Sequence, residues 1–246
     1  MKEGATPLNL AAQKGHAAVM EQLIVARSNV DLEVAHGTTP LFFAAKHGHV
    51  VVTKQRLAAC CNVGLHTKQG YTPLHVAANH GHAAVTEQLI AARCDVDLQD
   101  ENGFTSLHFA VLNGHAAVTG KLIAASCNVD LQTIHGATPL CLAAHKGHAA
   151  VTKLLMAARY NVDLQVMNGL TALQLAERQE HAGIATRIQN KKHKGVDRAM
   201  KDTLLQANPE EIKKQQEDAD RMMKQLLAKG GTRRGADGCG EDSGKG

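Results

Sequence analysis

Residues 70–82 read GYTPLHVAANHGH, and this pattern decides the fold because it returns, with variation, every 33 residues. The opening glycines of the successive copies are Gly4, Gly37, Gly70, Gly103, Gly136 and Gly169. A fixed period of this length is typical of small units stacked in an array, and it argues against one globular core. Residues 4–195 are therefore expected to repeat a single structural unit.

Each copy predicts a pair of short helices. Thr72 suits an N-cap position and Pro73 the first helical position, where its missing N–H costs nothing. Apolar side chains then recur at helical spacing along residues 74–78. Gly81 is expected to end this helix, and His82 to begin a second one before an extended loop leads to the next copy.

The pattern Gly-x-Thr-Pro-Leu-His-x-Ala-Ala-x-x-Gly-His resembles the ankyrin repeat over about residues 1–183. The resemblance implies an all-α fold, an ankyrin-type helix-turn-helix solenoid from which short hairpin-like loops project as fingers. The array is expected to span residues 1–195. Its repeats are expected at 4–36, 37–69, 70–102, 103–135, 136–168 and 169–195.

The pattern changes after Gly195. Residues 196–229 predict a C-terminal helical extension, within which Asn208-Pro209 begins a helix with loose heptad spacing. That helix either pairs with another chain as a coiled coil, packs back on the array or stays in solvent. Residues 230–246 are rich in glycine and charge, so a disordered tail is expected.

Charge is distributed unevenly along the chain. The net charge is +4, and residues 1–183 contain as many Lys and Arg as Asp and Glu, so the excess lies in the C-terminal part. A neutral array is unlike a nucleic-acid binder. The basic stretch 187–201 is a nuclear address, a phosphate contact or, as we favour, the solvated face of a helix. Nucleic-acid association through this tail remains a weaker interpretation.

The cysteines and the lack of long apolar runs are informative about the cellular compartment of the protein. Cys61, Cys94 and Cys127 occupy one column of successive repeats. Stacked helices lie roughly 8–10 Å apart, beyond the ~7 Å limit for disulfide formation. Reduced thiols in the cytoplasm or the nucleus are expected. Met1 leads directly into the first repeat, which predicts no signal peptide, and no apolar run is long enough to span a membrane.

The histidines raise the question of metal binding or catalysis. One histidine per repeat forms a column at His16, His49, His82, His115 and His148. At about 10 Å spacing they cannot share one ion, whose bonds are about 2.1 Å long. They are interpreted as bonding to backbone across repeats, and His75 and His108 as satisfying turn carbonyls or the preceding threonine. No catalytic motif is present, so neither enzyme activity, nor a cofactor, nor a metal is expected.

Two repeats depart from the pattern. In repeat 2, Arg56 stands where other copies have leucine, and Gly64 where they have aspartate. An arginine in a core column is costly unless its head reaches water. Cys60 stands where the family has glycine at the end of the second helix, so either a strained left-handed residue or a different helix end is expected. Repeat 1 has almost nothing upstream, which means that it caps itself or, as we favour, continues a longer array.

The function that the resemblance implies is non-enzymatic protein binding through the fingers and the inner helices. The alternative is an architectural or targeting segment of a larger multidomain protein. Tyr71 and Phe104 are expected to project side by side from neighbouring fingers, with Asp100 and Glu101 as an acidic rim. An apolar strip is expected along the later fingers, and polar positions on the inner helices complete the surface. The candidate protein-binding residues are Tyr71, Asp100, Glu101, Phe104, Ile134, Met167, Leu170, Lys46, Asn79 and Leu112. The sequence does not identify the partner.

Overall fold

The computed structural model describes residues 6–26, 31, 33–158, 160–161 and 163–193. The chain divides into two units, Met1–Lys192 and His193–Gly246, and the described residues lie almost entirely in the first. The predicted extension at 196–229 and the predicted tail at 230–246 lie outside the described residues.

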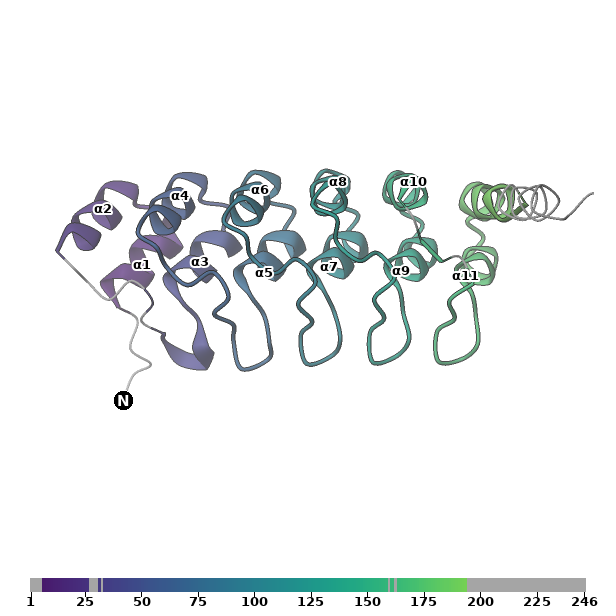
Figure 1. Cartoon of the computed structure of the whole chain (residues 1–246), viewed down its shortest axis with the longest axis horizontal. Helices are drawn as coiled ribbons and strands as arrows, with labels where there is room; N and C mark the ends of the chain where they lie inside the picture. Colours follow the sequence, from purple (N-terminus) through teal and green to yellow (C-terminus); the bar gives the residue numbers. More distant parts are fainter. Residues whose placement is uncertain (1–5, 27–30, 32, 159, 162, 194–246) are drawn as a thin grey trace, which may run out of the picture. The chain divides into compact units, whose positions relative to one another are not determined.

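Two rows of helices make up the described unit (Figure 1). The inner helices are α1 (Pro7–Lys14), α3 (Pro40–Lys46), α5 (Pro73–Asn79), α7 (Ser106–Leu112), α9 (Pro139–Lys146) and α11 (Ala172–Arg178). The outer helices are α2 (Ala17–Val25), α4 (Val50–Ala58), α6 (Ala83–Ala91), α8 (Ala116–Ala124) and α10 (Ala149–Ala157), followed by a helical stretch at 182–193. A single 3-10 turn, η1 (Ala35–Gly37), lies in the first finger. The all-α solenoid expected from the sequence is confirmed.

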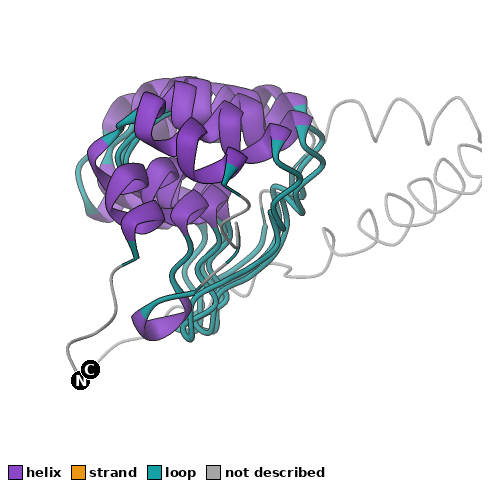
Figure 2. Ribbon diagram, turned by 90° about the vertical axis from the view of Figure 1, so that its left-hand side faces the viewer, coloured by secondary structure: helices purple, strands orange, loops and turns teal. Residues whose placement is uncertain are grey.

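The fingers are the loops 33–38, 66–71, 99–104, 132–137 and 165–170, and they project to one side of the inner helices (Figure 2). The described part of the chain contains isolated bridges such as Val34 to Thr38 but no named strand. Each finger is therefore a hairpin-like turn rather than a piece of sheet.

The inner helices begin as the sequence predicts. The Thr72 hydroxyl accepts a hydrogen bond from the His75 N–H, and Pro73 occupies the first turn of α5. Leu74, Ala77 and Ala78 are at most 1% exposed. Because this face carries small side chains, each inner helix packs closely on the next.

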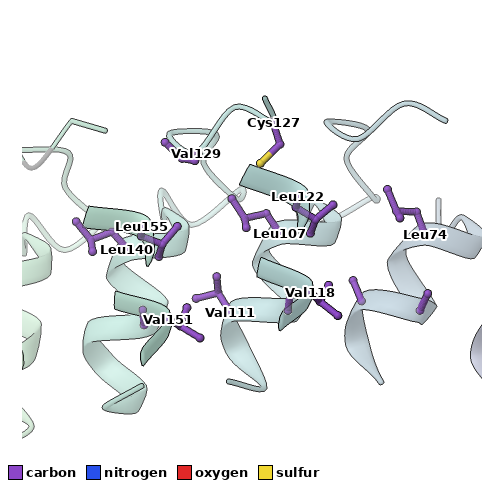
Figure 3. Packing of buried hydrophobic residues seen from close by; sticks show 14 of the residues in the cluster. Leu74, Leu107, Val111, Val118, Leu122, Cys127, Val129, Leu140, Val151 and Leu155 are labelled. Carbon is purple, nitrogen blue, oxygen red and sulfur yellow. The ribbon is translucent and has the colours of Figure 1, made fainter. Parts of the chain in front are cut away.

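The core is a series of leucine and valine layers between the two rows (Figure 3). Leu74, Leu107 and Leu140 come from inner helices, and Leu122 and Leu155 from outer ones. The buried apolar residues of the described part form two clusters, a small one in repeats 1 and 2 and a large one that reaches from Leu41 to Ile188. The small cluster ends in repeat 2, the repeat that departs most from the pattern.

Three outer helices, α4, α6 and α8, end in a left-handed residue that is not glycine. Cys60, Arg93 and Ser126 have φ of 54°, 58° and 61°. An L-residue in this conformation costs on the order of 1 kcal/mol. Of the two alternatives that the sequence left open, the strained left-handed residue is therefore the one observed.

Candidate functional site

The fingers are tied to one another through backbone. Within finger 99–104 the Asp100 N–H donates to the Phe104 carbonyl at 2.9 Å. Between fingers, the Glu101 N–H donates to the Gln69 carbonyl at 3.2 Å, and the Ile134 N–H donates to the Asn102 carbonyl at 3.0 Å. This ladder holds the tips of neighbouring fingers at fixed positions.

Glycine is required in the fingers by both conformation and space. Gly103 has φ of 76°, and a Cβ there would lie 2.9 Å from the Ile134 nitrogen. That separation is too short for a carbon atom. The neighbouring atom belongs to the backbone, which cannot move aside without disturbing the next finger. The next finger can therefore approach only because this position has no side chain.

His75 connects its own helix to the following finger. Its Nδ1 accepts a hydrogen bond from the Thr72 N–H at 3.1 Å, which assigns the proton to Nε2. Nε2 then donates to the carbonyls of Leu98 at 3.0 Å and Phe104 at 3.2 Å. His108 repeats the arrangement with the Ala137 carbonyl at 3.2 Å. The interpretation of both histidines as partners of turn carbonyls and threonines is confirmed.

Both of these histidines are neutral in the folded protein at pH 7. Burial lowers the pKa of His108 to about 4, against the opposing effect of hydrogen bonds to the Ala137 and Leu131 carbonyls. Burial also lowers the pKa of His75. The rings therefore act as neutral struts that fix the fingers against the helices.

A cluster of aromatic rings lies where the fingers meet the inner helices. The ring centroid of Phe109 on α7 is 5.7 Å from that of Tyr71, 5.4 Å from that of Phe104 and 5.8 Å from that of His75. Tyr71, Phe104 and Phe109 are each half-buried. These three residues are called the aromatic cluster below. Edge-to-face ring pairs of this kind prefer such separations.

The aromatic cluster corrects one expectation. Tyr71 and Phe104 do not project freely from the fingers, because each packs against Phe109. Sequence reasoning missed Phe109, although its column is apolar in every copy: Leu10, Phe43, Val76, Phe109, Leu142 and Leu175. This column, the apolar row, lies on the inner helices and is half-buried except at the more exposed Leu10.

Asp100 is not part of an acidic rim, which is a second correction. Its side chain is buried, and Oδ1 accepts hydrogen bonds from the N–H groups of Asn102 at 2.9 Å and Phe104 at 2.7 Å. Thr67 occupies the same place in the preceding finger, where its hydroxyl accepts from the Tyr71 N–H at 3.1 Å. Asp100 therefore closes its own turn, and only Glu101 of the predicted pair is exposed.

The other candidate residues lie on the same side of the unit as the aromatic cluster. Ile134 and Met167 are 56% and 76% exposed at finger tips, and Leu170 is half-buried. The candidates on the inner helices are the exposed Lys46 and the half-buried Asn79 and Leu112. The fingers and the exposed and half-buried side chains of the inner helices are together called the finger–helix surface below.

The Gly-His column binds successive repeats together. The ring of His82 lies against Gly48, where a Cβ would be 2.6 Å from Nδ1, and its Nε2 bonds to the Lys46 carbonyl at 3.1 Å. His49 makes the equivalent bond to the Gln13 carbonyl at 3.0 Å. The prediction that the column histidines bond to backbone across repeats is confirmed for His49, His82, His115 and His148. Among the described residues, no group of three or more His, Cys, Asp or Glu side chains is placed to hold a metal ion.

The column cysteines carry free thiols. Burial raises the pKa of Cys94 to about 11 and that of Cys127 to about 12, so both thiols are protonated at neutral pH. A protonated, buried thiol is a poor nucleophile. These side chains therefore act as small apolar groups in the core.

No helix in the described part of the chain is both long and apolar enough to cross a membrane. The paired helices, the ladder of fingers and the inter-repeat histidines together define a helical repeat array of the kind that presents a surface to a partner. A family model of ankyrin repeats in three copies matches residues 1–55 and 52–133, and one of ankyrin repeats in many copies matches residues 122–176. The chain therefore belongs to the ankyrin repeat family. A search of the curated proteins found no match.

Proposed function

We propose that this chain binds a partner protein, without catalysis, through the finger–helix surface of repeats 3 to 5. The observation that carries the proposal is the aromatic cluster, three half-buried rings on a backbone that the finger ladder holds rigid. Aromatic side chains with one accessible face are typical of the centre of a protein interface. A rigid surface also loses little conformational entropy on binding.

The remaining candidates extend this surface. Ile134 and Met167 offer exposed apolar area on the next two fingers, and Glu101 offers an acidic side chain between them and the aromatic cluster. Ankyrin repeats in general are protein-interaction modules, which agrees with the proposal. The protonated thiols of the core suit a reducing compartment, the cytoplasm or the nucleus.

The test begins with affinity capture on the full chain and on its Tyr71→Ala and Phe104→Ala variants. A protein that is retained by the wild type and lost with the variants is then purified and titrated. We expect each substitution to weaken binding by roughly 1–3 kcal/mol.

The matched control is Lys153→Ala, an exposed site on the outer helix α10. Glu87 is a poorer control, because its carboxylate pairs with Lys121 at 2.6 Å. Thermal melting of each variant separates a loss of fold from a loss of affinity. Equal weakening by the control and by the aromatic substitutions would place the binding site elsewhere.

A further inference from the structure

Basic side chains lie in the last turns of four of the six inner helices, the exceptions being the central helices α5 and α7, and they are called the basic row below. The exposed side chains there are Lys14 on α1, Lys46 on α3, Lys146 on α9 and Arg178 on α11, against Glu177 alone. Exposed histidines stand among them at His47, His80 and His145. Four of the inner helices therefore present positive charge, although residues 1–183 contain as many Lys and Arg as Asp and Glu.

Most of the acidic side chains of these repeats are engaged elsewhere. Asp97 accepts a hydrogen bond from the Asn128 N–H at 2.8 Å, and Asp130 accepts from the Asn161 N–H at 3.0 Å. Asp100 is buried in its finger. Glu33 and Glu101 are exposed, and both lie on fingers rather than on inner helices. The inner helices thus carry four exposed cations and one exposed carboxylate, whereas the exposed carboxylates Glu33 and Glu101 share the fingers with the exposed Lys68.

The basic row runs beside the apolar row. Phe43 and Lys46 are three residues apart on α3, and Leu142 and Lys146 are four residues apart on α9, so each pair shares one helix face. Three or four residues are about one helical turn, which rises about 5.4 Å. Apolar and cationic groups therefore alternate across a strip narrow enough for one extended segment to touch both.

We infer that the finger–helix surface takes an extended protein segment in which apolar anchors are accompanied by acidic side chains. The inference rests on the proposed function and specifies the chemistry of the partner. Neighbouring inner helices lie roughly 8–10 Å apart, and an extended chain rises about 3.3 Å per residue. One anchor about every third residue matches the repeat spacing, with carboxylates between anchors facing the basic row.

Helix dipoles offer a purely structural reason for the same residues. Lys and Arg in the last turn of a helix stabilise it by facing the negative end of the dipole. That role predicts a change in stability when the charge is removed and no change in ligand affinity. The experiment must therefore measure both.

The probe is a labelled peptide of about twelve residues with Leu-Glu-Glu repeated, titrated against the full chain by fluorescence anisotropy. Two matched peptides replace every Glu by Lys or every Leu by Ala. We expect the Leu-Glu-Glu peptide to bind at least tenfold more tightly than either. Added salt should weaken it, because exposed charge pairs are screened.

Substitutions on the inner helices test whether the peptide binds at the finger–helix surface. Lys46→Gln combined with Lys146→Gln should lower the affinity for the Leu-Glu-Glu peptide at least threefold, and Tyr71→Ala should lower it as well. The control is Lys54→Gln combined with Lys153→Gln, which removes the same charge from exposed sites on the outer helices α4 and α10. Melting temperatures should stay within a few degrees of the wild type.

Three results would overturn the inference. Equal binding of the Glu and Lys peptides would show that charge does not select the partner. Equal loss in both lysine pairs, or in neither, would place binding elsewhere, as on the basic stretch 187–201. If a captured partner depends on Tyr71 but not on Lys46 and Lys146, protein binding stands and the acidic partner is excluded.

Discussion

At the scale of single residues, Arg56 is a charged side chain at a position where repeats 3 to 5 bury leucine. The side chain is fully buried on α4, in the column that holds Leu89 and Leu122 in the next two repeats. One guanidinium nitrogen lies 3.9 Å from an Asp31 oxygen. Burial lowers the pKa of Arg56, and the neighbouring Cys61 and Asp31 oppose that shift. Removing a cation from water costs several kcal/mol, and replacing a buried ion pair by an apolar residue of similar volume is often neutral or stabilising.

Arg56→Leu is therefore expected to stabilise the array by roughly 1 kcal/mol or more, since a leucine of similar volume needs no desolvation. Asp31 would keep its hydrogen bonds from the Asn62 N–H at 3.1 and 3.2 Å. The measurement is the free energy of unfolding in urea, with Lys54→Leu at an exposed site of α4 as the control. A midpoint that stays or falls in Arg56→Leu would show that the ion pair compensates for the burial.

At the scale of the repeat, the loops after the outer helices carry a regular bond between neighbours. Asp31, Asp97 and Asp130 each accept from a backbone N–H in the next repeat, at Asn62, Asn128 and Asn161. Gly64 interrupts this series, because it has no side chain to reach Asp95. Repeat 2 therefore combines a buried cation with a missing link to repeat 3.

Gly64→Asn is expected to restore the link and to raise stability by about 1 kcal/mol, from one hydrogen bond and from the lower entropy of the unfolded chain. Asparagine is preferred to aspartate here because the Asp95 carboxylate stands where other copies have asparagine, and it would repel a second carboxylate. The backbone offers no obstacle, since a Cβ would meet only Asn62 Oδ1, at 3.4 Å. Asn128→Ala keeps the backbone N–H that Asp97 binds but removes the Oδ1 that accepts from the Asp130 N–H at 3.0 Å, so it measures this side-chain bond separately from the link between repeats. Unchanged urea unfolding of Gly64→Asn would mean that the repeats are coupled without this bond.

At the scale of the whole molecule, buried neutral histidines make stability depend on pH. Burial lowers the pKa of His108 to about 4 in the folded state, against about 6.5 for an unperturbed imidazole. Between pH 6.5 and pH 4 the imidazole is protonated in the unfolded chain but stays neutral in the folded one. The contribution of neutral His108 to the free energy of unfolding is therefore fully present above pH 6.5 and is lost as the pH falls toward 4. A shift of this size corresponds to on the order of 3 kcal/mol, and His75 contributes in the same direction.

His108→Gln should flatten this dependence. Gln174 shows that glutamine serves in the same place, since its Oε1 accepts from the Thr171 N–H at 2.9 Å and completes the same capping box. Thermal melting between pH 7 and pH 4 is expected to show a smaller loss for the variant than for the wild type. Parallel pH profiles of the two proteins would assign the acid sensitivity to other groups.

Local chemistry, repeated at a fixed period, determined the elements of this protein. The threonine caps, the prolines at first helical positions and the glycine turns act within a few residues of themselves, so the sequence alone predicted the paired helices and their family. The inter-repeat role of the histidines followed from their period, because one spacing places every member of a column in the same environment. The candidate site stays a prediction: Tyr71 and Phe104 lie on neighbouring fingers, but they pack on Phe109 and do not project freely.

Only the tertiary structure decided how residues from different repeats meet. Phe109 contacts Phe104 from the finger that directly precedes α7, and it contacts Tyr71, 38 positions earlier, because α7 packs beside α5, the helix that follows the finger of Tyr71. An aspartate in a loop is expected to be exposed, yet the Asp100 carboxylate is buried and accepts hydrogen bonds from two backbone N–H groups. Arg56 is enclosed because its neighbours on both sides follow the pattern that it breaks. Whether a side chain is buried depends on the repeats packed around it and cannot be inferred from its residue type alone.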